Sequence, residues 1–240
     1  MPGDVRAILL DIEGTTTPVD FVTRVLFPYA RERVREFLIR RASEVRDDLA
    51  RLLSEHEADL RAGQSPPPWR HDTPTEALES AVAYVHWLMD RDRKSTALKA
   101  LQGRIWDEGY RAGELRGQVY PDVPRALARW RAQGRDVAIF SSGSVLAQRL
   151  LFSRSEAGDL TPLLRDYFDT TTGAKGDPES YRKIATRLGQ APAAVLFLSD
   201  VTAELDAARG AGMSTALCVR AGEAPATDHR VVRSFDEVLT

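Results

Sequence analysis

The chain has 240 residues, which is enough for one large domain or for a core with a smaller insert. Its 33 basic and 35 acidic residues leave a net charge of −2, which argues against binding nucleic acid or anionic membranes through a basic field. Hydrophobic residues make up 43% of the sequence, so a substantial core can be buried.

The cysteine content and the apolar runs bear on the compartment. No N-terminal signal precedes the first apolar run, and no run approaches the roughly 20 residues that cross a bilayer. The single cysteine, Cys218, cannot form an intramolecular disulfide and lies in an apolar run, so we expect a small buried residue rather than a nucleophile. We therefore expect a cytoplasmic protein in a reducing environment, with no membrane and no nucleic-acid partner.

A buried strand that ends in acidic residues is predicted near the start of the chain. The apolar run from Val5 to Leu10 is followed by Asp11, Glu13, Gly14 and three threonines. Ligands of open α/β sheets bind outside the carboxyl ends of the strands, so Asp11 would face that crevice. An acidic, hydroxyl-rich turn after a strand is also common without any site, so the later strands must decide.

A helical block without strand signals is predicted for residues 20–115. Residues 19–29 are expected to form a loop, and one amphipathic helix, or two, follows over residues 31–62. Further helices are predicted at residues 73–89 and 95–106. Such a block between the first strand and the later α/β units indicates an inserted cap rather than an independent domain.

Alternating strands and helices are predicted beyond the helical block. Further apolar strands are expected at residues 136–140, 194–199 and 215–219, with helices between them. Nearly continuous apolar strands are typical of a parallel sheet that is buried on both faces. The predicted fold is therefore α/β, with a Rossmann-like parallel sheet core formed by residues 1–19 and 116–240 and an all-helical cap formed by residues 20–115.

Reactive and polar side chains follow three of the predicted strands. They are Asp11 with Glu13, then Ser141 with Ser142, then Asp200, and a loop adds Lys175. Because parallel strands end at one edge of the sheet, these groups can converge there. Two carboxylates at that edge would repel each other without a cation, and Mg²⁺ suits them because it binds oxygen ligands and a substrate phosphate. A lysine and paired hydroxyls suit the oxygens of a phosphoryl group.

These residue types also suit distinct roles in phosphoryl transfer. Asp11 could attack phosphorus and form an aspartyl-phosphate, which water then hydrolyses. Glu13 could protonate the leaving oxygen and later activate the water. Taken singly, each residue has an ordinary alternative: the serines as a turn, Lys175 as a surface residue, and Asp200 as the N-cap of the next helix. The order of these residues along the chain favours the functional interpretation.

The motifs resemble those of the haloacid dehalogenase superfamily, whose phosphatases use an aspartate nucleophile. The pattern is carried by Asp11-Ile-Glu-Gly-Thr, the strand ending at Ser141, Lys175, and Ser199-Asp200 with Glu204 four residues on. The superfamily usually has aspartate where this chain has Glu13. The form Asp-Ile-Glu-Gly-Thr-Thr-Thr-Pro is similar to that of the enolase-phosphatase E1 family. Further segments similar to that family are 26–29, 92–99, 101–103 and 140–145, so the resemblance includes the cap.

The resemblance implies a haloacid dehalogenase-like fold and a two-step reaction. Similar enzymes convert 2,3-diketo-5-methylthiopentyl-1-phosphate to its enol and then remove phosphate. The product is 1,2-dihydroxy-3-keto-5-methylthiopentene, in methionine salvage. The resemblance also implies one Mg²⁺ per chain and a small phosphorylated diketone as substrate. The balanced charge and the complete cap favour a monomer.

The resemblance further assigns roles to the site residues. The catalytic residues would be Asp11 as nucleophile, Glu13 and Lys175. The metal ligands would be Asp11, Asp200 and Glu13, the last through its backbone carbonyl or its side chain. Ser141, Ser142 and Lys175 would hold the phosphate, and Glu204 would orient Lys175 or a metal-bound water. In the cap, one or more of Lys94, Ser95, Lys99 and Gln102 would reach the substrate, although a solvated helix face is the more ordinary place for each.

Two alternative functions remain open, and one catalytic residue is not identified. A related Mg²⁺-dependent phosphatase acting on a sugar phosphate would carry the same general motifs. A receiver-type module also gathers acids, a hydroxyl and a lysine at strand ends, but it needs no helical insert after its first strand. The base that abstracts the proton in the enolisation step is not identified, and Glu13 and a cap residue are both candidates.

Overall fold

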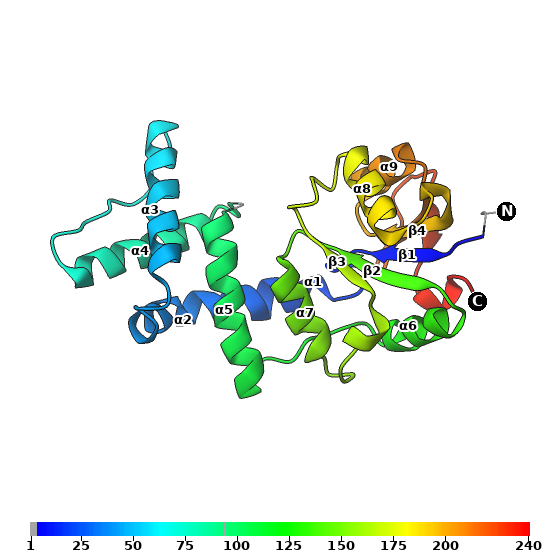
Figure 1. Cartoon of the computed structure of the whole chain (residues 1–240), viewed down its shortest axis with the longest axis horizontal. Coiled ribbons are helices and arrows are strands. Elements are labelled where there is room, and N and C mark those ends of the chain that lie inside the picture. Colours follow the sequence, from blue (N-terminus) through cyan, green and yellow to red (C-terminus); the bar gives the residue numbers. More distant parts are fainter. Residues whose placement is uncertain (1–3, 94) are drawn as a thin grey trace. The chain divides into compact units, whose positions relative to one another are not determined.

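The computed structural model describes residues 4–93 and 95–240 (Figure 1). Within them the chain forms two compact units. The first unit contains the described residues up to Val22 together with Leu115–Thr240, and the second is Thr23–Glu114. Lys94, which the sequence places in the cap segment, lies outside the described residues.

The first unit is built on a parallel sheet. Its strands within the described residues are β1 (Ala7–Leu10), β2 (Asp136–Phe140), β3 (Asp166–Phe168), β4 (Val195–Ser199), β5 (Ser214–Cys218) and β6 (Arg230–Val232). They lie in the order β3-β2-β1-β4-β5-β6, and every neighbouring pair is parallel. This confirms the predicted α/β fold. The strand order reverses between β1 and β4, which is where open α/β sheets bind their ligands.

Helices cover both faces of this sheet. They are α6 (Asp122–Ala132), α7 (Val145–Ser153), α8 (Pro178–Leu188) and α9 (Thr202–Gly210), with short 3₁₀ turns η2 (Thr161–Leu163), η3 (Pro192–Ala194) and η4 (Phe235–Glu237). Figure 1 shows α8 and α9 on one face and α6 and α7 on the other. On the α8 and α9 face, Leu9 and Phe140 of the sheet share a buried cluster with Tyr181 and Leu205.

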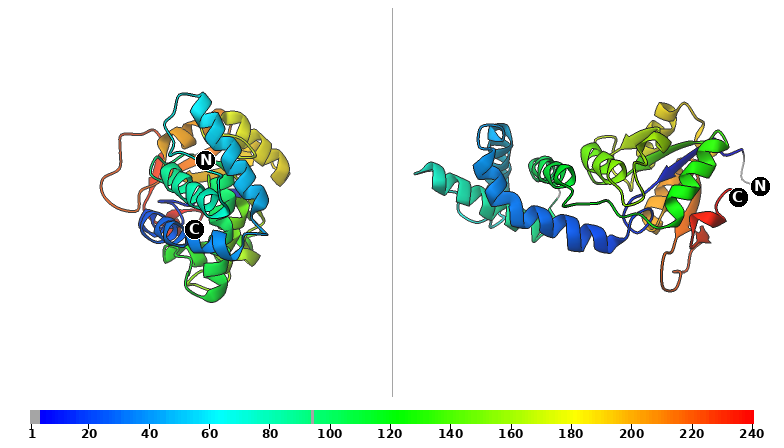
Figure 2. Two further views of the ribbon diagram at one scale, coloured as in Figure 1. Left: turned by 90° about the vertical axis from the view of Figure 1, so that its left-hand side faces the viewer. Right: turned by 90° about the horizontal axis from the view of Figure 1, so that it is seen from below.

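Two of the observed strands, β3 and β6, were not predicted from the sequence. Each has three residues and lies at an edge of the sheet, so each is too short to show an apolar run. Between β5 and β6 the chain forms a loop that projects from the sheet (Figure 2). The edge strands therefore owe their conformation to pairing with β2 and β5 rather than to a local signal.

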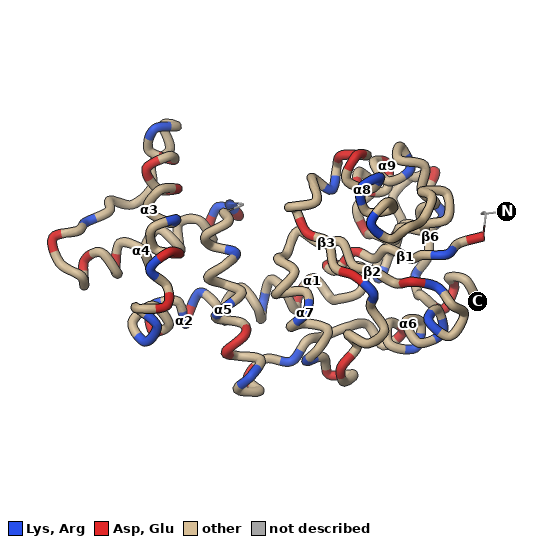
Figure 3. The backbone as a smooth tube through the Cα atoms, in the orientation of Figure 1, with Lys and Arg blue, Asp and Glu red and all other residues tan. Residues whose placement is uncertain are grey.

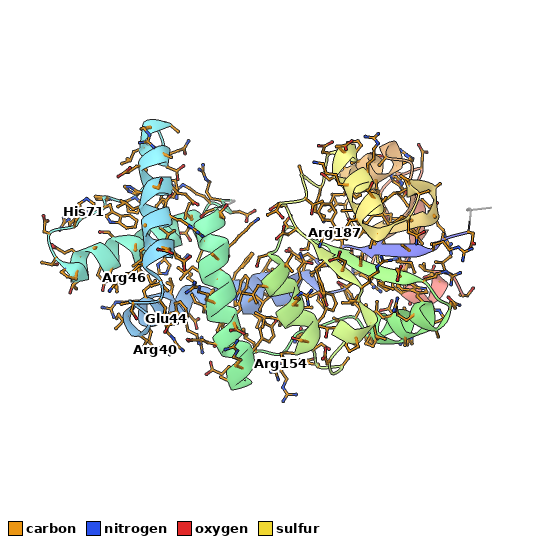
Figure 4. All side chains as sticks on the ribbon, viewed as in Figure 1. Arg40, Glu44, Arg46, His71, Arg154 and Arg187 are labelled. Atoms are coloured by element: carbon orange, nitrogen blue, oxygen red, sulfur yellow. The ribbon has the colours of Figure 1, made fainter. Side chains whose placement is uncertain are left out.

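The second unit is helical. It contains α2 (Phe27–Arg40), α3 (Arg46–Arg61), α4 (Pro74–Met89) and α5 (Thr96–Ala112). The amphipathic stretch at residues 31–62 thus forms two helices rather than one. At the C-terminal end of α2, Arg40 and Arg41 both form ion pairs with Glu108 of α5 at 2.8 Å. Arg40 is labelled in Figure 4. Acidic and basic residues are interspersed along this unit (Figure 3), as expected for solvated helix faces.

The loop predicted for residues 19–29 is wrong, because this segment is helical. It consists of α1 (Val19–Phe21), a π-helical stretch η1 (Val22–Leu26) and the start of α2. Pro28 cannot donate a backbone hydrogen bond to the preceding turn, and the wider π turn lies directly before it. The carbonyl of Leu26, the last residue of the π-helical stretch, accepts a hydrogen bond from the indole N–H of Trp106 at 2.8 Å. Among the described residues, no helix is both long and apolar enough to cross a bilayer.

Candidate active site

Asp11 lies at the point where the strand order reverses. It follows β1, whose last residue, Leu10, pairs with Ile139 of β2 and with Leu198 of β4. The backbone N–H of Asp11 donates to the carbonyl of Leu198 at 3.0 Å, so β1 and β4 remain paired up to this residue. The residue is only 4% exposed. Its carboxylate is therefore held at the carboxyl edge of the sheet with little contact to solvent.

The turn after Asp11 is closed by its own backbone. The N–H groups of Thr15, Thr16 and Thr17 all donate to the carbonyl of Ile12, at 3.2, 2.9 and 2.9 Å. The hydroxyl of Thr16 also donates to the carbonyl of Asp11 at 3.1 Å. These bonds fold residues 12–17 into a compact turn whose position is tied to the catalytic candidate Asp11.

Gly14 brings this turn against Asp200, which follows β4. Its φ of +69° lies in the left-handed region, which glycine adopts without strain. A Cβ atom at this position would lie 2.1 Å from Oδ2 of Asp200, which is closer than any real contact. The missing side chain therefore leaves the space that the Asp200 carboxylate occupies, and it brings Asp200 next to the turn that follows Asp11.

Lys175 joins two carboxylates in this region. Its Nζ lies 2.5 Å from Oδ1 of Asp11 and 2.6 Å from Oε2 of Glu204, and its side chain is 10% exposed. The loop that carries it is fixed from α8, because the hydroxyl of Tyr181 donates to the Lys175 carbonyl at 2.7 Å. Glu204, in the first turn of α9, also accepts a hydrogen bond from Ser199 at 2.9 Å. The N-cap position of α9 is occupied by Val201, so Asp200 is not the N-cap.

Burial changes the acidity of these groups. Burial raises the pKa of Asp11 to about 7, although the Lys175 ammonium opposes the change. Burial is also the main cause that raises the pKa of Asp200. For Lys175 burial disfavours the charged form, but the two adjacent carboxylates outweigh it and raise its pKa. Lys175 contacts two carboxylates, Asp11 and Glu204, and Asp200 adds a third acidic group beside Gly14. One ammonium group does not balance three acidic groups, so the site favours a further cation.

Ser141 and Ser142 follow β2 at the same edge of the sheet. Ser141 is 4% exposed, and its backbone N–H continues the pairing with β3 by donating to Phe168 at 3.1 Å. Its hydroxyl accepts a hydrogen bond from the N–H of Gly143 at 3.2 Å, and Ser142 beside it is half-buried. The Lys175 Nζ lies 5.9 Å from the ring centroid of Phe140, the residue before Ser141. The lysine and the serine pair thus belong to neighbouring parts of one site.

Glu13 differs from the other site residues because its side chain is exposed, whereas Asp11 two residues earlier is buried. Glu13 forms an isolated parallel bridge with Thr17, which belongs to the same turn. Its backbone is therefore fixed by the turn, while its side chain extends toward solvent. This position suits a group that exchanges protons with substrate or water.

The donor set fits a divalent cation that prefers oxygen. Asp11 and Asp200 supply carboxylate oxygens at the ends of adjacent strands, and Gly14 lets the Asp200 carboxylate lie against the turn that follows Asp11. Within the described residues, no three histidine, cysteine or acidic side chains are grouped into a complete metal site. Mg²⁺ commonly binds to one or two carboxylates and takes its remaining ligands from water and substrate phosphate. The site therefore suits Mg²⁺ better than a metal that needs a cage of protein ligands.

A hollow in the helical unit has different chemistry. Its volume is about 730 Å³, and it is lined mainly by apolar side chains of α2, α3 and α4, with His71 (labelled in Figure 4). The two charged residues in its lining, Arg35 and Glu79, form an ion pair with each other at 2.6 Å. The hollow lacks the converging carboxylates of the sheet edge, so we place the chemistry at Asp11.

The structure also shows features that the sequence did not reveal. Arg220 contacts the turn after Asp11, and the buried hydroxyls of Thr15 and Thr17 have no hydrogen-bond partner among the described residues. A single arginine after an apolar strand carries no local signal of such a contact.

The predicted burial of Cys218 is confirmed. The residue is 1% exposed, and burial raises the pKa of its thiol to about 11.

Comparisons with known proteins agree with the class that the fold and the site indicate, a hydrolase with a parallel α/β core and with a carboxylate and a lysine at the edge of its sheet. A family model of haloacid dehalogenase-like hydrolases matches residues 5–212. Enolase-phosphatase E1 of Synechococcus elongatus is 52% identical over 99% of both chains, and that of Klebsiella oxytoca is 47% identical over 98% of this chain and 96% of the relative. The chain therefore belongs to the enolase-phosphatase E1 family of the haloacid dehalogenase-like hydrolases.

Solved structures agree with this assignment. The crystal structure of the UTR4 protein from Saccharomyces cerevisiae is 32% identical, with a TM-score of 0.73, and the match covers 98% of this chain and 100% of that one. A haloacid dehalogenase-type phosphatase from Thermococcus onnurineus is 18% identical with a TM-score of 0.61, over 98% and 96% of the two chains. At that identity the second match supports the fold alone.

Proposed function

We propose that this enzyme converts 2,3-diketo-5-methylthiopentyl-1-phosphate to its enol and then to 1,2-dihydroxy-3-keto-5-methylthiopentene and phosphate, in methionine salvage. The observation that carries the phosphatase half is the contact of Lys175 with both Asp11 and Glu204 at the carboxyl edge of the sheet. The similarity to enolase-phosphatase E1 proteins over nearly the whole chain supports the substrate.

In the phosphatase half, Asp11 is the proposed nucleophile. One oxygen of its carboxylate forms a bond to phosphorus while the bond between phosphorus and the substrate oxygen breaks. Glu13 gives a proton to that leaving oxygen. A water molecule then attacks the phosphorus of the aspartyl-phosphate, Glu13 takes a proton from the water, and phosphate leaves as the Asp11 carboxylate is restored. The buried position of Asp11 supports this role, because solvent is largely excluded around it.

Lys175, Ser141 and Ser142 are proposed to hold the phosphate. The ammonium group of Lys175 has three hydrogens, and its contacts to Asp11 and Glu204 account for two of them. The third hydrogen and the serine hydroxyls can bond to phosphoryl oxygens. Glu204 is proposed to orient Lys175, which the 2.6 Å contact between them supports. This arrangement supplies positive charge and donors where negative charge develops.

We propose that one Mg²⁺ completes the site, held by Asp11, Asp200 and either the backbone carbonyl or the side chain of Glu13. When bound, this ion supplies positive charge to the phosphoryl oxygens.

The helical unit, Thr23–Glu114, is proposed to act as the cap that excludes water from the phosphoenzyme. The base for the enolisation is either Glu13 or a residue of the helical unit. A monomer in the cytoplasm completes the proposal, supported by the balanced charge and the buried Cys218.

A substrate panel tests this function. Purified enzyme is assayed for phosphate release from the diketo phosphate and from a sugar phosphate such as glucose 6-phosphate, with Mg²⁺ and with EDTA. We expect release from the diketo phosphate in Mg²⁺, with a transient absorbance of the enol, and loss of release in EDTA. Preferential cleavage of the sugar phosphate would instead support the related sugar-phosphate phosphatase, and release that EDTA leaves unchanged would contradict the proposed metal.

A further inference from the structure

Arg220 connects the end of the sheet to the turn that follows the proposed nucleophile. It lies two residues after β5, and its side chain is only 8% exposed. Its Nε and Nη2 both donate to the backbone carbonyl of Thr15, at 3.0 and 2.6 Å. Two N–H groups of one guanidinium thus bind a single carbonyl of the turn formed by residues 12–17, and they fix both its position and its direction.

Asp122 and two aromatic rings hold the guanidinium in place. Nη1 of Arg220 donates to Oδ2 of Asp122 at 2.6 Å, and the same oxygen accepts the backbone N–H of Phe235 at 2.6 Å. The guanidinium carbon lies 4.3 Å from the ring centroid of Tyr120 and 4.5 Å from that of Phe235. Since both its edge and its faces are occupied, the guanidinium has a single defined orientation.

A second contact anchors the next carbonyl of the same turn. The backbone N–H of Tyr120 donates to the carbonyl of Thr16 at 2.9 Å. Residues from two other parts of the first unit, Tyr120 and Arg220, therefore hold consecutive carbonyls. The backbone bonds within residues 12–17 set the shape of the turn, and these two outside contacts fix its place beside the sheet.

The anchored turn lies against the carboxylate of Asp200 and is bonded to the backbone of Asp11, the two proposed carboxylate ligands of the metal. Gly14, directly before Thr15, lies against the carboxylate of Asp200, and the Thr16 hydroxyl donates to the carbonyl of Asp11. A shift of the Thr15 carbonyl would therefore move Gly14, which lies against Asp200, and the backbone of Asp11. A displacement of about 1 Å in a catalytic constellation can cost about 100-fold in rate.

We propose that Arg220 is a positioning residue, which sets the spacing of Asp11 and Asp200 through the Thr15 carbonyl. This inference rests on the proposed function, because that function gives the two carboxylates their roles. Arg220 does not contact the reacting atoms in this assignment. Its effect should therefore appear in kcat and in the Mg²⁺ concentration that gives half-maximal rate, with little change in KM.

The test compares Arg220→Lys with a matched control. Lysine keeps the charge but cannot bind the Thr15 carbonyl and Asp122 with a planar fork. The control is Arg125→Gln, which removes an exposed arginine of α6 that pairs with Asp236. Steady-state rates and the Mg²⁺ dependence are measured below the Tm of every variant. We expect Arg220→Lys to lower kcat by about 10- to 100-fold, to raise the half-saturating Mg²⁺ concentration, and to change KM less than about 3-fold. The control should match the wild type.

Asp122→Asn serves as a second variant, because it keeps the Arg220 guanidinium but removes the carboxylate charge that holds Arg220 and the Phe235 N–H. We expect a smaller loss of kcat in the same pattern. A folded Arg220→Lys enzyme with wild-type kcat and Mg²⁺ dependence would overturn the inference, as would a variant that changes only the Tm. A wild-type enzyme that releases no phosphate would overturn the proposed function instead, so the two failures are distinguishable.

Discussion

The ammonium nitrogen of Lys175 lies 2.5 Å from Oδ1 of Asp11 and 2.6 Å from Oε2 of Glu204. One buried cation thus connects the end of β1 with the first turn of α9. The contact with Lys175 favours the charged form of the Asp11 carboxylate, which burial disfavours. It also leaves the lysine placed to bind a phosphoryl group that reaches Asp11.

Replacing Lys175 tests this contact. In Lys175→Met, Asp11 and Glu204 would face each other without a cation, and removing one partner of a buried pair costs about 3 kcal/mol. We expect urea denaturation to show a loss of about that size, together with loss of phosphate release. Adding Glu204→Gln to the same chain should restore part of the stability but not the activity. Lys183→Met, on an exposed position of α8, is the control and should change neither. A fully stable Lys175→Met would contradict the account of the contact.

Gly14 provides a second test, in which backbone strain can be separated from crowding. Gly14→Ala adds a Cβ atom 2.1 Å from Oδ2 of Asp200 at a φ of +69°. Gly134→Ala is the matched control, because its φ is +75° and nothing lies within 4 Å of the added Cβ atom. Both variants should lose about 1–2 kcal/mol in free energy of unfolding from the left-handed conformation.

Only the variant at Gly14 should also lose activity. Because Asp200 must move away from the added methyl group, we expect a fall in kcat of about 100-fold and a weaker response to Mg²⁺. Phosphate-release assays across a series of Mg²⁺ concentrations measure both effects. Equal activity in the two alanine variants would mean that the close approach of Gly14 to Asp200 has no role in the reaction.

The pair of Asp122 and Arg220 predicts a dependence of stability on pH. Burial by itself would raise the pKa of Asp122, but the hydrogen bonds from Arg220 and from the Phe235 N–H outweigh it, and the pKa is lowered. A carboxyl group with a lowered pKa in the folded state stabilises the protein above its unfolded pKa of about 3.9, and this stabilisation is lost as the pH falls through the folded pKa.

Asp122→Asn should therefore be less stable than the wild type at neutral pH. The difference should shrink below about pH 4, where the wild type loses the contribution of the ionised carboxyl group. Denaturation curves collected from pH 7 to the acid limit of folding measure this trend. Asp72→Asn, at an exposed position, is the control and should follow the wild type. A difference that stays constant with pH would rule out the ionised pair as its source.

Much of the candidate site at the edge of the sheet could be predicted because its sequence signals are local. Apolar runs of four or five residues ended at Asp11, Ser141 and Asp200, and parallel strands end at one edge of a sheet. Given that fold, the arrival of all three groups in one region follows from topology. The sequence does not decide whether residues 31–62 form one helix or two, since periodicity alone does not show where the chain turns.

The rest depends on contacts between distant parts of the chain. The edge strands β3 and β6 have three residues each, so their sequences carry no periodic pattern. The role of Arg220 depends on Thr15 and Asp122, which are 205 and 98 residues away in the sequence. The helical start at Val19 was missed because the mixed apolar and polar sequence containing Pro28 is typical of a loop. In the structure a π-helical turn precedes this proline.

Asp11→Asn tests whether Asp11 forms the covalent bond to phosphorus. The amide is a poor nucleophile. The fold should remain intact, because burial already raises the pKa of the Asp11 carboxyl group to about 7 and a neutral side chain is therefore tolerated there. The measurement is phosphate release from the diketo phosphate in Mg²⁺, with the Tm recorded for both proteins. We predict a rate at least about 1,000-fold below the wild type at an equal or higher Tm. Phosphate release at the wild-type rate by folded Asp11→Asn would contradict the account.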